Sequence, residues 1–261
     1  MNINIEDMAS RVQLCTLSMK KWQPNKLSKA ETAKLRAVHG TDAARVMVTL
    51  CDAPELDDLT KLHNAARSEF NKLTLPAVQD GFRIVPMGRQ IQHAETMAGH
   101  ERQITAKVAE IVRLYPEWLR AAPARLNGLF DPSAWPTDID AKFGYRVRYM
   151  ACPTMGEWGE WLKESALIAQ SDLQERFRAA LVRVVERCGS GGKLHETVFT
   201  GLSELCELVP DMDLSGKLAP LAQMAAPIGA LDAEVVRGSD RVRADAAAHA
   251  DRILGMMGGI S

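Results

Sequence analysis

The sequence predicts an α+β fold that is mostly α, and three observations support this class. The segment Phe143–Pro153 alternates apolar and charged residues with the two-residue period of a half-buried strand. Apolar residues at three- and four-residue spacing, which is typical of helices, lie on both sides of this strand. Two helical segments, residues 87–115 and 157–188, are long enough to form an antiparallel pair. We expect a small two- or three-stranded sheet at one end of this pair and a C-terminal helical group that covers it.

The first part of the chain shows one strand and three helices. Residues 10–22 are rich in β-formers with apolar residues on both faces, so a central, covered strand is expected there. A capping box at Ser28–Glu31 begins a helix that runs to about residue 40. The next predicted helix covers residues 41–51, and a longer one begins at Pro54.

Residues 82–86 form a short second strand that leads into the long helix 87–115, whose apolar residues fit a heptad seam. Pro116 and Pro123 are expected to end that helix before a turn-rich loop and the strand at 143–152. A second capping box begins the other long helix. Smaller helical patterns follow at residues 194–209, 217–226 and 231–256.

The composition is that of an ordinary soluble globular protein, with 46% hydrophobic and 25% charged residues in a chain of 261. No apolar run reaches the roughly 18 residues of a membrane span, and no secretory signal pattern is present. A cytoplasmic protein without a membrane partner is therefore expected. The five cysteines are scattered and form no CxxC motif, which favours buried free thiols over disulfides or a zinc site.

Positive charge is concentrated near the N-terminus, although the formal net charge is only −1. Residues 1–50 carry eight Lys or Arg and four Asp or Glu, whereas residues 151–261 carry eleven basic and sixteen acidic residues. A polyanion would therefore have to dock on the N-terminal half. We divide the chain into an α+β half at residues 1–153 with a basic N-terminus and an all-helical half at residues 154–261, packed as one unit.

No familiar catalytic, cofactor or metal motif is complete. Residues Gly189–Lys193 read GSGGK, but the stretch follows a helix and lacks the first glycine and the Ser or Thr of a phosphate loop. His93 and His100 share a helix face without further converging donors, which disfavours a metal site. Gly201–Ser203 begins like a nucleophile elbow, but Leu205 stands where glycine is needed. No catalytic, cofactor-binding or metal-binding residue is predicted, and a non-enzymatic protein is favoured.

The strand at residues 143–152 is the one constellation that points to a ligand. Tyr145 and Tyr149 could stack on bases while Arg146 and Arg148 pair with phosphates, as in sheet modules that bind single-stranded nucleic acid. The candidate residues for such binding are Lys20, Lys21, Lys26, Arg146 and Arg148. The tyrosines and arginines point to opposite faces, so one face cannot use all four. The favoured interpretation is that the tyrosines pack under the helices and the arginines are solvated.

Trp158 and Trp161 lie in the first turns of the second long helix. Tryptophans at this spacing are usually core residues, and they are also frequent anchors of protein interfaces. We favour the core and keep an interface as the alternative.

Four segments in a fixed order span nearly the whole chain. They read LCTLSMKKW, LFDPSAWPTDIDAKFGYRVRYMACP, FTGLSELCELVPDMDLSGKLAPL and VRADAAAHADRILGMM. In this order they resemble an uncharacterised family of bacteriophage and mobile-element proteins, domain of unknown function 3150. The resemblance implies a mostly helical fold and a location in the cytoplasm of a bacterial host. It also implies a DNA-metabolism setting, because relatives are often encoded beside DNA recombination genes or a ring-forming ATPase. It implies no functional residue.

Three hypotheses for the function follow. The leading one is a non-enzymatic phage or mobile-element accessory protein that acts without a cofactor, through a protein partner or by homo-oligomerisation along its long helices. The second is a single-stranded nucleic-acid-binding protein that uses the basic N-terminal half. The third is an enzyme, or an inhibitor of a host enzyme, whose site carries no recognisable motif. No small-molecule substrate is evident.

Overall fold

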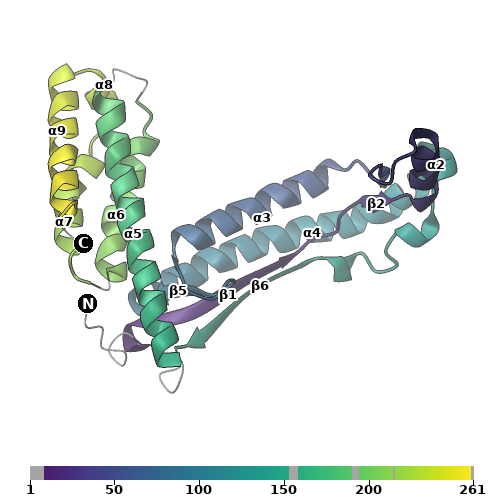
Figure 1. Cartoon of the computed structure of the whole chain (residues 1–261), viewed down its shortest axis with the longest axis horizontal. Coiled ribbons are helices and arrows are strands. Elements are labelled where there is room, and N and C mark those ends of the chain that lie inside the picture. Colours follow the sequence, from purple (N-terminus) through teal and green to yellow (C-terminus); the bar gives the residue numbers. More distant parts are fainter. Residues whose placement is uncertain (1–8, 153–157, 190–193, 214, 260–261) are drawn as a thin grey trace. The chain divides into compact units, whose positions relative to one another are not determined.

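The computed structural model describes residues 9–152, 158–189, 194–213 and 215–259 (Figure 1). Helices make up 68% of the structure and the strands form a small antiparallel sheet, which confirms the predicted class, α+β and mostly α. Among the described residues, no helix is both long enough and apolar enough to cross a membrane.

The chain divides into two compact units, each assembled from segments that are distant in sequence. Unit 1 comprises Met1–Thr16, Asn71–His93 and Tyr149–Ser261, and unit 2 comprises Leu17–Phe70 and Ala94–Arg148. The boundaries fall inside two strands and two helices, so these four elements pass from one unit into the other. The boundary predicted from the sequence, between residues 153 and 154, lies outside the described residues.

Four strands form the main sheet in the order β4-β5-β1-β6. Strand β1 (Val12–Lys20) pairs antiparallel with β5 (Arg83–Pro86), and β4 (Leu75–Pro76) pairs with the other edge of β5. Strand β6 (Gly144–Ala151) lies on the other side of β1. The three strands predicted from the sequence are confirmed. Strand β4 was not predicted, because its two residues are too few to show a periodicity.

A second sheet pairs β2 (Asn25–Leu27) with β3 (Met47–Thr49). The helix predicted at residues 41–51 is therefore wrong. The segment before β3 is held extended by the Thr32 hydroxyl, whose Oγ1 accepts a hydrogen bond from the Val46 backbone N–H at 3.0 Å. This bond joins β3 to the preceding helix, and such a tertiary contact is not visible in the local sequence pattern.

Helix α2 (Lys29–His39) begins as predicted at Ser28, whose Oγ accepts a hydrogen bond from the Glu31 backbone N–H at 3.3 Å. It ends at Gly40, which takes a left-handed φ of 60° that glycine tolerates best. Helix α3 (Pro54–Lys72) begins at Pro54 as predicted and buries Leu56, Leu59, Ala66 and Phe70.

Helix α4 (Gln90–Leu126) is longer than predicted, because Pro116 and Pro123 lie inside it. A proline in a helix interior removes a backbone hydrogen bond and crowds the preceding turn, at a cost of about 3 kcal/mol. Both prolines are exposed here, and the neighbouring Tyr115 and Ala122 are buried, so core packing carries the helix through both positions. Short 3-10 turns lie at Met87–Arg89, Asn127–Leu129, Pro132–Ala134 and Asp140–Lys142.

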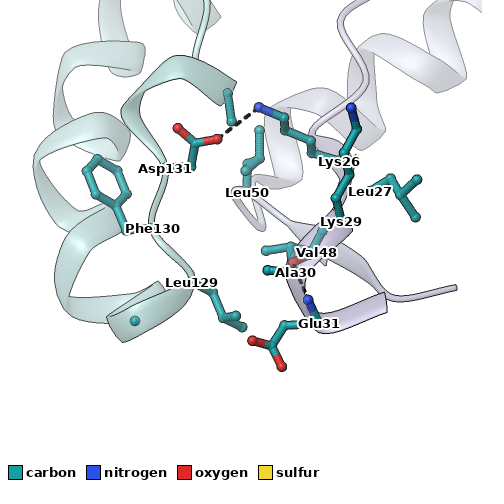
Figure 2. Close-up of a pocket in the computed structure, with 13 residues that line it drawn as sticks. Lys26, Leu27, Lys29, Ala30, Glu31, Val48, Leu50, Leu129, Phe130 and Asp131 are labelled. Carbon is teal, nitrogen blue, oxygen red and sulfur yellow. Dashed lines mark hydrogen bonds and ion pairs between the residues drawn. The ribbon is translucent and has the colours of Figure 1, made fainter. Parts of the chain in front are cut away.

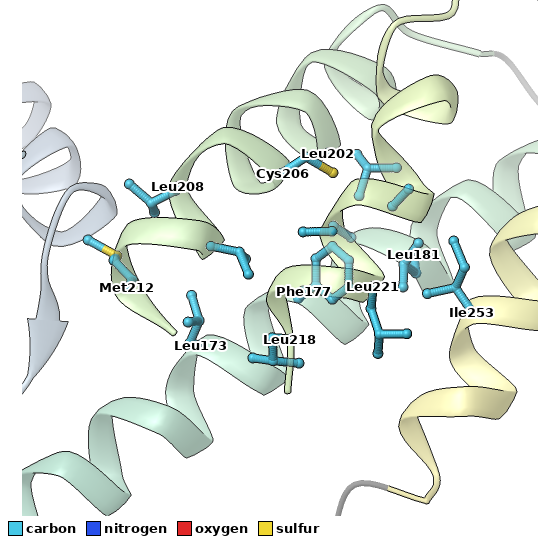
Figure 3. Close-up of a cluster of buried hydrophobic side chains, with 14 of the residues drawn as sticks. Leu173, Phe177, Leu181, Leu202, Cys206, Leu208, Met212, Leu218, Leu221 and Ile253 are labelled. Carbon is cyan, nitrogen blue, oxygen red and sulfur yellow. The ribbon is translucent and has the colours of Figure 1, made fainter. Parts of the chain in front are cut away.

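Unit 1 is built around α5 (Trp158–Gly189), which packs mainly on α9 (Asp240–Met257) and α6 (Thr197–Met212). Helix α7 (Ala219–Gly229) packs on α6, and α8 (Ala233–Arg237) precedes α9. Figure 3 shows the buried cluster that these helices share. It includes Phe177, Leu181, Leu202 and Ile253, whose side chains are fully buried.

The two long helices belong to different cores, so the predicted antiparallel pairing of one with the other is corrected. The buried stripe of α4, which includes Ile104 and Ile111, shares a cluster with Leu59 of α3. The stripe of α5, which includes Leu173, belongs to the cluster of α6, α7 and α9. Apolar periodicity marks the buried face of a helix, but it does not identify the helix that covers that face.

The helix predicted at residues 231–256 is divided into α8 and α9 at Gly238. Ser239 then caps α9, since its Oγ accepts a hydrogen bond from the Val242 backbone N–H at 3.3 Å. A helix can restart within one residue of a break when the next side chain satisfies its free N–H groups.

Packing also explains two features that could have suggested chemistry. A side chain on Gly229 of α7 would begin 2.8 Å from the Cα of Ser203 in α6, so Ser203 lies in a close helix–helix contact. All five cysteine side chains are buried, as predicted. Burial raises the pKa of the Cys15 thiol to about 12, so this thiol is not a thiolate nucleophile at neutral pH.

A buried carboxylate, Asp213, connects α6 to α7. Its Oδ2 accepts hydrogen bonds from the backbone N–H groups of Leu218 and Ala219, at 2.6 and 2.9 Å. Its Oδ1 accepts from the Ser215 N–H at 3.0 Å and from Gln170 Nε2 at 3.1 Å. Burial raises the pKa of this carboxyl, but the hydrogen bonds from Ser215, Ala219 and Leu218 outweigh burial, and the pKa is lowered from its usual value.

We predict that Asp213→Ala lowers the free energy of unfolding by about 3 kcal/mol at pH 7, because several buried donors lose their acceptor. The folded-state pKa is lowered, so the contribution of this carboxylate is complete above its unfolded pKa of about 3.9. It is lost as the pH falls through the folded-state pKa. Urea unfolding at pH 7 and at pH 3 measures both effects. Asp251→Ala, at an exposed carboxylate of α9, is the control, and equal losses in the two variants at pH 7 would contradict the prediction.

Candidate nucleic-acid interface

One face of the β1–β6 strand pair carries basic side chains. Gly144 of β6 lies against Lys20 of β1, since a side chain at this glycine would begin 3.7 Å from the Lys20 Cβ. Side chains alternate along a strand, so Arg146 and Arg148 point to the same side as Gly144. Lys142, two residues before Gly144, is exposed like these three basic side chains. We call Lys20, Lys142, Arg146 and Arg148 the basic strip, which lies entirely within unit 2.

The tyrosines of β6 point to the opposite face, where both hydroxyl groups contact residues of α4. The Tyr145 hydroxyl donates a hydrogen bond to the Met97 carbonyl oxygen at 3.2 Å, and burial raises the pKa of Tyr145 to about 12. The Tyr149 hydroxyl lies 2.7 Å from Nδ1 of His93. The interpretation favoured from the sequence, with tyrosines under the helices and arginines in solvent, is confirmed. The basic strip therefore has no tyrosine ring on its own face.

The His93 side chain is 1% exposed, and its imidazole meets the Tyr149 ring edge-on at a centroid distance of 5.6 Å. Burial lowers the pKa of His93 to about 4, so the ring is neutral at pH 7. In the described part of the chain, no group of three or more His, Cys, Asp or Glu residues is arranged to hold a metal ion. The contacts of His93 are thus those of a core histidine.

We predict that stability falls as the pH is lowered from about 6.5 toward 4, in part because of His93. The unfolded histidine binds a proton near pH 6.5, whereas the folded pKa is about 4, so its contribution is complete above about pH 6.5 and is lost below. This difference in pKa between the folded and unfolded states contributes about 3 kcal/mol to the free energy of unfolding. Thermal unfolding from pH 7 to 4.5 should show a flatter pH profile in His93→Leu, despite its lower stability at pH 7. His39→Gln, at an exposed histidine, is the control, and parallel profiles for wild type and His93→Leu would rule the prediction out.

The basic strip is not neutralised by the protein itself. Within the described part of the chain, its four side chains form no ion pair and no hydrogen bond. Some other basic side chains of unit 2 are paired, as Lys107 is with Asp58 and Glu110. A row of unpaired cations on one open face gives a local positive potential that attracts polyanions, even though the whole chain is slightly acidic.

Lys21 lies beside the end of this strip, and Lys26 lies apart from it. Lys21 follows Lys20 directly, and its Nζ donates a hydrogen bond to Thr60 Oγ1 at 3.3 Å. Lys26 lies in β2 and forms a 3.0 Å ion pair with Asp131. Of the five basic residues predicted from the sequence, Lys20, Arg146 and Arg148 lie on one strand face. Lys21 lies beside it at α3, and Lys26 lies elsewhere in β2.

Lys142 was missed by the sequence analysis, although a signal for it existed. It lies two residues before Gly144 and thus continues the two-residue period of Arg146 and Arg148 toward the N-terminus. The residue ends a short 3-10 turn, so the alternation of the strand itself begins only after it.

Lys21 and Lys142 line the same pocket, which has a volume of about 370 Å³ and lies within unit 2. The other residues that line it are Trp22, Gln23, Ser133, Ala134, Trp135 and Pro136. Both indole rings pack against the Tyr115 ring, at centroid distances of 5.8 and 5.9 Å. We call this site the tryptophan pocket, and it joins two cations to a rigid wall in which both indole rings are almost fully buried.

A larger pocket of unit 2, of about 470 Å³, lies between the start of α2 and the segment that follows α4. Figure 2 shows the ion pair of Lys26 with Asp131 at one side of this pocket. Leu27 and Leu129 also line it and are 39% and 44% exposed. We call it the α2 pocket, and its lining combines these apolar side chains with the paired Lys26 and with Lys29, which forms no ion pair among the described residues.

The remaining sequence candidates do not add to this surface. Trp161 packs edge-on against Phe82 at a centroid distance of 6.5 Å and borders the core of unit 1, which agrees with the core assignment. The side chain of Trp158 and residues 190–193 of the GSGGK stretch lie outside the described residues.

Comparisons with protein-family models, with curated proteins and with solved structures find no match. Membership of the phage and mobile-element family therefore stays a prediction, and the functional argument depends on the geometry of unit 2.

Proposed function

We propose that the protein binds the phosphate backbone of nucleic acid through the basic strip of unit 2. The observation that carries this proposal is that Lys20, Arg146 and Arg148 share one open face of a strand pair without any internal partner among the described residues. Lysine and arginine side chains that contact phosphates supply most of the affinity of non-specific nucleic-acid binding, by releasing condensed counterions.

A single strand fits this surface better than a duplex. Outward-facing residues of a β-strand recur every two residues, about 6.7 Å apart, which is comparable to the separation of successive phosphates in an extended single strand. Arg146 and Arg148 have this spacing along β6. Because the tyrosines face α4, contacts on the strip itself are limited to the backbone, so binding there is independent of base sequence and sensitive to salt.

The charge-reversal variant Arg146→Glu/Arg148→Glu tests the proposal. Fluorescence anisotropy with a labelled single strand of about 30 nucleotides should show at least a tenfold loss of affinity at moderate salt. The slope of log K against log salt should flatten by roughly 1.4, since each lost phosphate contact contributes about 0.7 for a single strand.

Arg178→Glu/Arg183→Glu is the matched control. It replaces two exposed arginines of α5 in unit 1 and changes the net charge by the same amount. Circular dichroism verifies that both variants are folded. If the two variants lose affinity equally, or if the wild type does not bind the strand at low salt, the proposal is refuted.

A second candidate function, association with a protein partner or with a second copy, is favoured by an apolar patch beside the α2 pocket. Leu27 and Met47 are paired across β2 and β3 and are 39% and 56% exposed, and Leu129 across the pocket is 44% exposed. We call these three residues the apolar patch. Contiguous exposed apolar side chains beside a pocket are typical of interaction surfaces.

If the apolar patch mediates self-association, Leu27→Thr/Met47→Thr should convert an oligomer into a monomer, because each copy loses apolar area at the contact. Light scattering coupled to size exclusion measures the mass. Val38→Thr is the control, since this exposed residue of α2 does not line the α2 pocket. A wild-type protein that is already monomeric, or an oligomer that persists in the double variant, would exclude self-association through this patch.

A further inference from the structure

We propose that the tryptophan pocket binds one nucleotide of the strand that lies on the basic strip, with the base in the pocket and its phosphate between Lys21 and Lys142. This inference rests on the proposed function and makes it more specific. The strand face itself offers only cations, which contact phosphates. The inference assigns contacts with a base to the pocket beside the strip.

The position of the pocket relative to the strip is the first argument. Lys21 directly follows Lys20 of β1, and Lys142 precedes Gly144 of β6 by two residues. Gly144 lies against Lys20, so the ends of both strands meet at the pocket. A backbone that contacts Arg146 and then Lys20 is therefore led to the mouth of this pocket.

The shape and surface of the pocket are the second argument. A volume of about 370 Å³ is within the range of small-ligand sites and can accept a nucleobase with part of its sugar. Trp22 and Trp135 are only 8% and 6% exposed, and they are fixed against each other at a centroid distance of 5.9 Å. The Tyr115 hydroxyl donates to the Pro136 carbonyl oxygen at 2.7 Å and fixes the same wall. The wall of the pocket is therefore preformed, and it loses little conformational entropy when a base enters the pocket.

The polar groups are the third argument. Lys142 forms no ion pair among the described residues, and Lys21 bonds only to the neutral Thr60 hydroxyl. Ser133 Oγ donates to Asp131 at 2.7 Å, so its lone pairs remain to accept from a base. The exposed amide of Gln23 can both donate and accept. Cations for a phosphate and neutral groups for a base edge are the features of nucleotide recognition.

The α2 pocket fits a nucleotide less well, although it is larger. Its Lys26 is already paired with Asp131 at 3.0 Å, and a phosphate would have to displace that carboxylate. The exposed Leu27 and Leu129 give it an apolar rim. The tryptophan pocket thus has two lysines without a carboxylate partner among the described residues, Lys21 and Lys142, whereas the α2 pocket has one, Lys29.

The experiment compares two labelled strands of equal length, one with thymine bases and one in which every base is replaced by an abasic site. Anisotropy should show that the wild type binds the thymine strand about fivefold or more tightly, which is the lower range for one stacked base. In Ala134→Leu, which narrows the pocket without changing charge, the ratio of the two affinities should fall to about one.

A second measurement needs no variant. A strand that carries 5-iodouracil, irradiated on the wild-type protein, should crosslink to Trp22 or to residues 133–136, as mass spectrometry of the peptides would show. If the thymine and abasic strands bind equally and both weaken in Arg146→Glu/Arg148→Glu, the pocket inference fails while the proposed function stands. If neither strand binds, the proposed function fails as well.

Discussion

The hydrogen bond from the Tyr145 hydroxyl to the Met97 carbonyl oxygen ties β6 to α4 inside unit 2. Because strand side chains alternate, this one contact decides the direction of every residue in the strand. Tyr145 and the strand residues two and four positions after it lie on the covered face, whereas Arg146 and Arg148 lie on the open face. A shift of one residue would bury two guanidinium groups without partners, which is far more costly than burying two phenols.

The candidate site follows from this arrangement because β1 and β6 are neighbours in the sheet. Lys20 at the end of β1 is brought to Gly144 at the start of β6, and the flanking residues Lys21 and Lys142 meet at one pocket. A strip of cations thus lies along one strand pair, and a pocket walled by two buried tryptophans lies at one end of that pair. Backbone contacts would supply affinity there, and the pocket would supply contact with a base.

Unit 1 has a different physical character. Its helices enclose a fully buried apolar cluster, which includes Phe177, and the Asp213 carboxylate accepts hydrogen bonds from the backbone N–H groups at the start of α7. The cost of burying that carboxylate is offset by donors that would otherwise be left unsatisfied at the helix terminus. These contacts of unit 1 stabilise the fold. Its described residues provide no row of unpaired charge on an open strand face.

Much of the fold could be predicted from local patterns, and the failures share one cause. Strands β1, β5 and β6 could be predicted because each depends on the pattern of neighbouring residues. The same holds for the helix cap at Ser28. Residues 41–51 form no helix because Thr32 holds Val46 in an extended segment. Helix α4 passes Pro116 because its other face is buried in a core. In both places a contact between distant segments outweighs the local preference.

The sequence by itself determined the two-residue alternation of β6, and with it the separation of Tyr145 from Arg146, because alternation is a property of the backbone. It also determined the basic character of the residues around Lys20. Only the tertiary structure decided that Lys142 joins Lys21 at one pocket while Lys26 is neutralised elsewhere. These outcomes depend on which segments pair across more than one hundred residues, and no local pattern carries that information.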